Sequence, residues 1–95
     1  VSAENQSISE TILHQPEPNP AANVSVVRFS LAKAGDVKLV LRDLTGKQIH
    51  VYEMRNLSAG QHRHSIDLSG LGNGTYIVTM ESADVTMSVK MMVVK

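Results

Sequence analysis

The sequence predicts an all-β fold in which two antiparallel sheets form a sandwich, and three observations support this fold class. Short stretches of alternating apolar and polar residues recur at intervals of about 8 to 12 residues. Glycine, proline, asparagine and aspartate separate these stretches, and no window shows a helical period. We therefore expect a single immunoglobulin-like antiparallel β-sandwich of about seven strands.

Composition excludes several classes of function. Nine basic and nine acidic side chains cancel, so no strong field exists to hold nucleic acid or an anionic membrane. The chain has no cysteine, which excludes a disulfide scaffold and a thiolate nucleophile. It also lacks a run of about 18 apolar residues, so no membrane insertion is expected. The opening Val-Ser-Ala-Glu-Asn is not a signal peptide and suggests a carboxy-terminal fragment of a longer protein.

The amino-terminal part predicts a linker followed by an edge strand. Residues 1–12 are mostly polar and are expected to form a disordered linker, with the folded domain over residues 13–95. A short strand around Ile12 and Leu13 belongs at an edge, because the prolines that follow it lack backbone donors. A second strand covers residues 24–31, where a change of parity predicts a bulge near Val26.

The middle of the chain predicts a hairpin. Residues 37–42 alternate most clearly and indicate a core strand, which ends at a turn formed by Asp43 and Gly46. The next strand, residues 49–54, has apolar residues on both faces, which is typical of a central or doubly covered position. Residues 56–61 are expected to form a loop.

The last part predicts three more strands. Residues 62–68 and 76–80 alternate on either side of a glycine-rich turn, and such a short connection favours antiparallel neighbours. Gly74 is expected to adopt a positive φ. The final strand follows a turn at residues 82–84 and runs to the end of the chain. The predicted core contains eight residues: Phe29, Leu39, Leu41, Ile66, Leu71, Tyr76, Val78 and Val89.

Two histidines offer a candidate metal site. His62 and His64 project from the same face of a strand, as in many zinc sites. A third ligand would have to come from His50, Glu53 or Asp67. The interpretation we favour is that His62 caps a loop by a hydrogen bond and His64 is half-buried beside Ile66, so no metal or other cofactor is expected.

The remaining candidates also favour structural roles. Asp43 and Asp67 are interpreted as turn and capping carboxylates rather than a catalytic pair. The glycines at 70, 72 and 74 lie in a turn between strands and do not open a helix that could hold phosphate. The methionines are expected to fill the core, except Met92, whose parity predicts exposure. No catalytic residue is predicted, so an enzyme is not expected.

The order of several motifs resembles the carboxy-terminal sorting domain, type A, of the type IX (Por) secretion system of Gram-negative bacteria. The matching residues in the second half are Leu57, Gly60, His62, Ile66, Asp67, Ser69, Leu71, Gly74 and Tyr76. Those in the first half are Pro18, Asn19, Pro20, Gly35, Val37, Leu41, Asp43 and Gly46. A terminal pattern adds Lys90, Val93 and Lys95, whereas Glu17 departs from the aromatic or aliphatic residue common at its position.

The resemblance implies that the domain is a non-catalytic carboxy-terminal secretion signal. An upstream, covalently linked passenger reaches the periplasm, and the outer-membrane translocon recognises the folded domain. A sortase-like protease then cuts within or just before residues 1–13 and attaches the passenger to an anionic lipopolysaccharide on the cell surface. The candidate translocon-recognition residues are Lys90, Met92, Val93, Val94 and Lys95.

An adhesion or accessory module of a secreted enzyme is the alternative, although carbohydrate binding normally uses exposed aromatic rings and aromatics are only 3% of this chain. An edge-strand dimer is left open.

Overall fold

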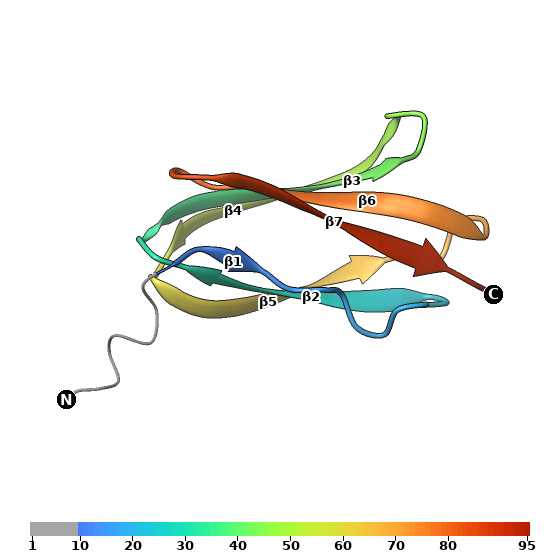
Figure 1. Cartoon of the computed structure of the whole chain (residues 1–95), viewed down its shortest axis with the longest axis horizontal. Helices are drawn as coiled ribbons and strands as arrows, with labels where there is room; N and C mark the ends of the chain where they lie inside the picture. The colour runs from blue at the N-terminus through green and yellow to red at the C-terminus, as the bar shows by residue number, and fades with distance from the viewer. Residues whose placement is uncertain (1–9) are drawn as a thin grey trace.

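The computed structural model describes residues 10–95 as two antiparallel β-sheets packed face to face (Figure 1). Most of the predicted linker, residues 1–9, lies outside the described residues. The strands are β1 (Ile12–Leu13), β2 (Val24–Leu31), β3 (Gly35–Asp43), β4 (Gln48–Leu57), β5 (Gly60–Asp67), β6 (Gly74–Glu81) and β7 (Thr86–Val93). One sheet has the order β1-β2-β5 and the other β4-β3-β6-β7. The predicted seven-stranded sandwich is confirmed, and this order is that of immunoglobulin-like folds.

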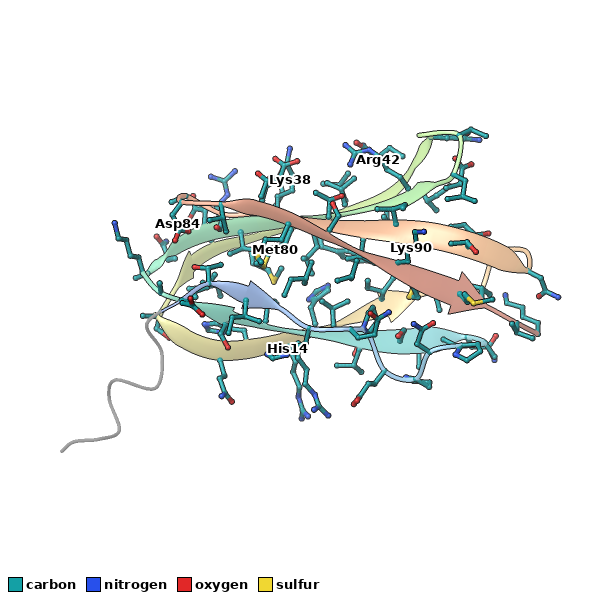
Figure 2. The ribbon with its side chains drawn as sticks, viewed as in Figure 1. His14, Lys38, Arg42, Met80, Asp84 and Lys90 are labelled. Atoms are coloured by element: carbon teal, nitrogen blue, oxygen red, sulfur yellow. The ribbon has the colours of Figure 1, made fainter. Side chains whose placement is uncertain are left out.

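The core lies between the sheets and is almost entirely aliphatic. Phe29 on β2 and Leu39 and Leu41 on β3 are at most 1% exposed, as their alternation predicts. Figure 2 shows Met80 between the sheets, whereas Lys38 and Arg42 project from the outer face of the four-stranded sheet. Six of the eight predicted core residues are buried; Leu71 and Val89 are partly buried and pack against the core. Residues 10–95 contain no helix long and apolar enough to cross a membrane.

The glycine-rich turn carries the chain from one sheet to the other. The expectation that the strands flanking it are neighbours is wrong, because β5 pairs with β2 while β6 lies between β3 and β7. The Leu68 N–H donates to the carbonyl of Asn23 (2.8 Å), which holds the chain on the β2 side before it crosses. The Tyr76 hydroxyl then donates to the Gly72 carbonyl (2.8 Å), the tyrosine corner typical of immunoglobulin-like domains.

Gly74 begins β6 at a φ of 153°, which confirms the predicted positive value. A Cβ there would meet no atom within 4 Å, so alanine would be strained by its backbone and not by crowding. We expect Gly74→Ala to lower the free energy of unfolding by about 1 kcal/mol or more in urea denaturation. Gly70→Ala is the matched control, because Gly70 is equally uncrowded and has no positive φ. Equal effects of the two substitutions would contradict the conformational argument.

Three local predictions are wrong. The pairing of β2 with β5 has no register shift, so no bulge lies near Val26. The Val26 side chain is only partly buried, and its N–H donates at the strand edge to the Glu17 carbonyl (2.8 Å). The strand β4 is an edge strand, although Val51 on its outer face does cover Val40 of β3, its register partner. The loop predicted at residues 56–61 is shorter, because only Ser58 and Ala59 lie between β4 and β5.

Candidate recognition site around the last strand

Residues 15–21, which we call the strap, bind the outer edge of β7. The Met92 N–H donates to the Asn19 side-chain oxygen Oδ1 (2.9 Å), and the Met92 carbonyl accepts from the Ala21 N–H (2.9 Å). The Val94 N–H donates to the Ala21 carbonyl (2.9 Å), so this contact forms a short parallel bridge. The Gln15 side chain donates through Nε2 to the Lys90 carbonyl (2.6 Å). The strap therefore occupies the Lys90 carbonyl, both backbone groups of Met92 and the N–H of Val94, the residue after β7.

The strap is also fixed to the opposite sheet. Glu17 pairs with Val26 of β2 through two backbone hydrogen bonds of 3.0 and 2.8 Å. Ser25, which is fully buried, donates its hydroxyl to the Pro18 carbonyl (3.0 Å). The strap thus joins β2 of one sheet to β7 of the other, and the prolines keep it extended between them.

The β5–β6 connection holds the residues that follow β7. The Lys95 ammonium donates to the carbonyls of Leu68 (2.9 Å) and Ser69 (3.2 Å). The Lys95 N–H donates to Oδ1 of Asn73 (2.9 Å). Two predicted motif regions, the strap and the glycine-rich turn, therefore hold neighbouring residues, the strap at Lys90 to Val94 and the turn region at Lys95.

The convergence leaves a distinct face exposed. Met92 is 47% and Val94 50% exposed, and Lys90 is exposed beside them, which confirms the exposure predicted for Met92. We call these three side chains the display face. Val93, predicted as a recognition residue, has its side chain fully buried in the core, and β7 ends there rather than at the end of the chain. Lys95 is exposed, but its ammonium binds the two turn carbonyls.

The other motif residues shape turns and strand ends. Asp43 accepts from the N–H groups of Thr45 (2.9 Å) and Lys47 (3.0 Å), and Gly46 has a φ of 93°, as the hairpin prediction requires. Gly60 starts β5 at a φ of 122°. Gly35 opens β3, opposite Leu57.

The second predicted capping carboxylate, Asp67, shapes the β5–β6 connection. It accepts from the Ser69 N–H (3.0 Å), and this bond together with the Ser69 hydroxyl holds the pKa of Asp67 below its usual value. A lowered pKa means that this contribution to stability is present at neutral pH and is lost as the pH falls through that pKa.

The histidines have structural partners. His62 binds the Ser58 carbonyl through Nε2 (2.7 Å) and stacks on Phe29 at 5.6 Å, as the capping interpretation expects. His64 is half-buried and its ring lies 4.5 Å from that of Tyr52. Across residues 10–95, no three histidine, cysteine, aspartate or glutamate side chains are grouped to hold a metal ion. The expectation that His62 and His64 form no specific metal site stays a prediction.

Comparison with known proteins identifies the family. The family model of the secretion system C-terminal sorting domain, of the Por type, matches residues 18–95. The chain belongs to this family. The match begins at Pro18 within the strap and includes β7, so it spans both partners of the contact described above. It does not separate subtypes, and type A therefore stays a prediction.

Two solved structures are similar to the sorting domain over part of their length. Both are the Parabacteroides merdae β-glucuronidase, one of them with glycerol in its active site. Their identities to this chain are 15% and 14%, with TM-scores of 0.49 and 0.46. Each match covers 87% of this chain and only 13% of the glucuronidase, so the sorting domain spans a small part of those proteins. None of the curated proteins compared with the chain matches it.

Sequence reasoning missed Gln15, Ala21 and Asn73. Each contacts residues more than 20 positions away, through a backbone group or a common amide side chain. Their positions carry no local periodicity. The one usable signal was the proline spacing in the strap, which indicates an extended segment but not its partner.

Asn19 offers a direct test of the strap. We expect Asn19→Ala to lower the free energy of unfolding by about 0.5 to 1.5 kcal/mol, because the Met92 N–H loses its acceptor. Amide hydrogen exchange at Met92 should accelerate while exchange at the β3 amides stays slow. Asn23→Ala is the control, since only the backbone carbonyl of Asn23 is engaged. Unchanged exchange at Met92 would contradict the assignment of this contact.

Proposed function

We propose that this sorting domain directs an upstream passenger across the outer membrane through the type IX secretion system. The observation that carries the proposal is the convergence of the strap and the β5–β6 connection on the end of β7. The matched residues 18–95 include the β5–β6 connection and most of the strap. The strap holds Lys90, Met92 and Val94, and the connection holds Lys95 next to them. A sorting signal needs a fixed surface for its receptor, and these contacts supply one.

The translocon would bind the side chains of the display face and would not pair with the backbone of β7. The Lys90 carbonyl, both backbone groups of Met92 and the Val94 N–H are already bonded to the strap, so a partner strand cannot form a continuous ladder along this edge. Side chains are the remaining means of recognition there. Two half-exposed apolar groups beside one lysine form a small amphipathic surface, suited to a receptor with an apolar pocket and an acidic rim.

Processing would follow export. A sortase-like protease would cut within or just before residues 1–13 and transfer the passenger to an anionic lipopolysaccharide. The passenger would then stay on the cell surface, or be secreted, after transit through the periplasm. A cut before Thr11 would leave the described strands in place, whereas a cut after Leu13 would remove a core residue, because Leu13 of β1 is 8% exposed and packs in the core.

A reporter protein tests the proposal. The reporter carries a signal peptide, is fused upstream of residue 1 and is expressed in a bacterium that has the type IX machinery. We expect the full fusion on the surface and a fusion lacking residues 13–95 in the periplasm. If the truncated fusion reaches the surface as efficiently as the full one, the sorting role is wrong and an adhesion or accessory module takes its place.

A further inference from the structure

Among the outer strands of the two sheets, β5 has the most open and regular edge. The strand β1 has only two residues, the strap is bonded to β7 at Lys90 and Met92, and the pairing of β4 with β3 shifts register at two points. In contrast, β5 pairs with β2 over eight residues without a shift and contains no proline. Within the described part of the chain, no strand pairs with its other edge. Such an edge is a template for another extended chain.

The hydrogen bonds at its end show which groups point outward. The Leu68 N–H donates toward β2, to Asn23, whereas the Asp67 N–H donates in the other direction, to the Tyr52 hydroxyl (3.3 Å). Because backbone groups alternate in direction along a strand, Gln61, Arg63 and Ser65 present their N–H and C=O groups at the outer edge. Tyr52 closes the edge at Asp67, so the open section is centred on Arg63.

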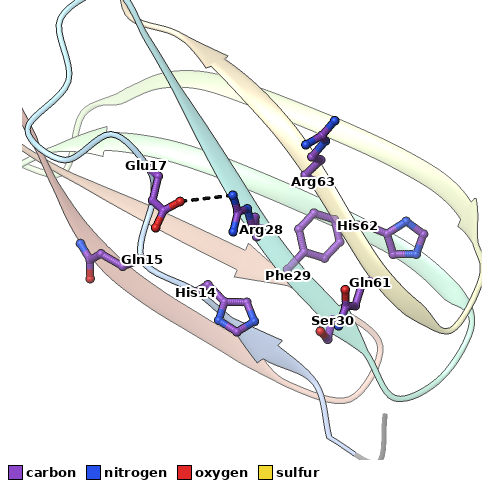
Figure 3. A pocket seen from close by; sticks show the side chains of 9 residues that line it. All are labelled: His14, Gln15, Glu17, Arg28, Phe29, Ser30, Gln61, His62 and Arg63. Carbon is purple, nitrogen blue, oxygen red and sulfur yellow. Dashed lines mark ion pairs between the residues drawn. The ribbon is translucent and has the colours of Figure 1, made fainter. Parts of the chain in front are cut away.

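The side chains on this face are basic. Arg63 lies directly opposite Arg28 of β2, and like charges in this position repel. Both arginines line a shallow groove of about 830 Å³ on the outer face of the three-stranded sheet. Figure 3 shows that Arg28 is paired with Glu17 of the strap (3.3 Å), the one carboxylate among the lining residues. Within residues 10–95, Arg63 has no ion-pair partner.

We propose that the outer edge of β5 binds an extended acidic segment of a partner protein, which adds to the sheet as a further strand with a carboxylate opposite Arg63. The backbone groups of Gln61, Arg63 and Ser65 supply the ladder, and the guanidinium of Arg63 donates two parallel hydrogen bonds to the carboxylate. The strap shows the same arrangement on the neighbouring strand. There the extended segment at Glu17 pairs with β2 through backbone bonds and places its carboxylate on Arg28.

The charge pattern argues against a second copy of this chain as the occupant. Two copies joined antiparallel through β5 and centred on the open section would place Arg63 opposite Arg63, with Arg28 beside each. Four guanidinium groups would then share one face of the sheet, with only Glu17 on each copy to compensate. The edge-strand dimer left open by the sequence is therefore disfavoured at β5, and a heterologous acidic strand fits instead.

Synthetic peptides and the 95-residue chain test this site without any export assay. The probe is a blocked peptide of about seven residues, a length that spans the open edge, which alternates valine and threonine and has glutamate at its centre. A second peptide has lysine there, and a third is the glutamate peptide with alternate amides N-methylated. We expect the glutamate peptide to shift the amide resonances of Gln61, Arg63 and Ser65 and to bind at least about tenfold more tightly than the lysine peptide. N-methylation should abolish binding, because it removes the ladder donors.

Charge reversal completes the test. Arg63→Glu should reverse the preference so that the lysine peptide binds more tightly, whereas Arg55→Glu on β4, an exposed arginine of the other sheet, should leave the preference unchanged. Equal binding of the charged peptides, or retained binding of the N-methylated peptide, would overturn the proposal. So would a stronger response of the same amides to inorganic polyphosphate, or sedimentation as a dimer that Arg63→Glu dissociates. None of these results bears on the reporter assay, so the two proposals fail independently.

Discussion

Replacing Phe29 by alanine is expected to lower the free energy of unfolding by about 3 to 5 kcal/mol, a large part of the stability of a domain this small. Phe29 is 1% exposed and is the only phenylalanine in a core made otherwise of aliphatic side chains, methionine and Tyr76. Rigid sheets on both sides prevent the gap from closing, and the stacked ring of His62 would lose its partner.

Urea denaturation measures the effect of Phe29→Ala, and the reporter assay measures its consequence. Leu44→Ala is the control, because Leu44 is 66% exposed and its truncation should change stability by at most about 0.5 kcal/mol. We expect surface export to fall with Phe29→Ala as the folded fraction falls. A loss of less than about 1 kcal/mol would mean that the core repacks around the missing ring.

Removing the display face should instead block export without unfolding the domain. The triple variant Lys90→Gln, Met92→Thr and Val94→Thr changes only exposed side chains and leaves the strap contacts intact, since these use backbone groups of β7. Stability should change by at most about 1 kcal/mol. We expect the surface fraction of the reporter to fall about tenfold or more, equivalent to about 1.4 kcal/mol of receptor binding.

The matched comparison for the display face is a triple variant on the outer face of β4. Glu53→Gln, Val51→Thr and Arg55→Gln make similar changes at exposed positions of an edge strand in the same sheet. Export should be normal in this variant. If both variants export equally well, the receptor does not read the display face, although the domain could still be the signal through another surface.

The strands could be predicted because alternation and turn residues are local properties. The span of β2 was predicted to the residue, and the hairpin at Asp43 and Gly46 was predicted with its capping bonds. Pairing was harder, because it depends on residues far apart. No residue between Asp67 and Gly74 indicates that the chain passes from one sheet to the other there. A connection of this length is equally compatible with a hairpin.

The candidate site was predicted in composition but not in arrangement. Exposure of Met92 follows from strand parity, and so does burial of Val93, which the motif resemblance nevertheless placed among the recognition residues. The role of Asn19 could not be predicted, because its partner Met92 is 73 positions away in the chain. Hydrogen bonds of this kind leave no periodic signal in a sequence.

The strap can form only when both ends of the described chain are present, which sets an order on folding. The Asn19 side chain can accept from the Met92 N–H only after the chain has been synthesised as far as Met92. Bringing such distant segments together has a large entropic cost and is therefore slow. A chain that lacks residues 92–95 has no partner for Asn19 or Ala21 and no lysine to bind the turn carbonyls. Closure of the strap therefore requires the residues at both ends of the sandwich, and a receptor that bound only the closed form would accept only chains that have finished folding.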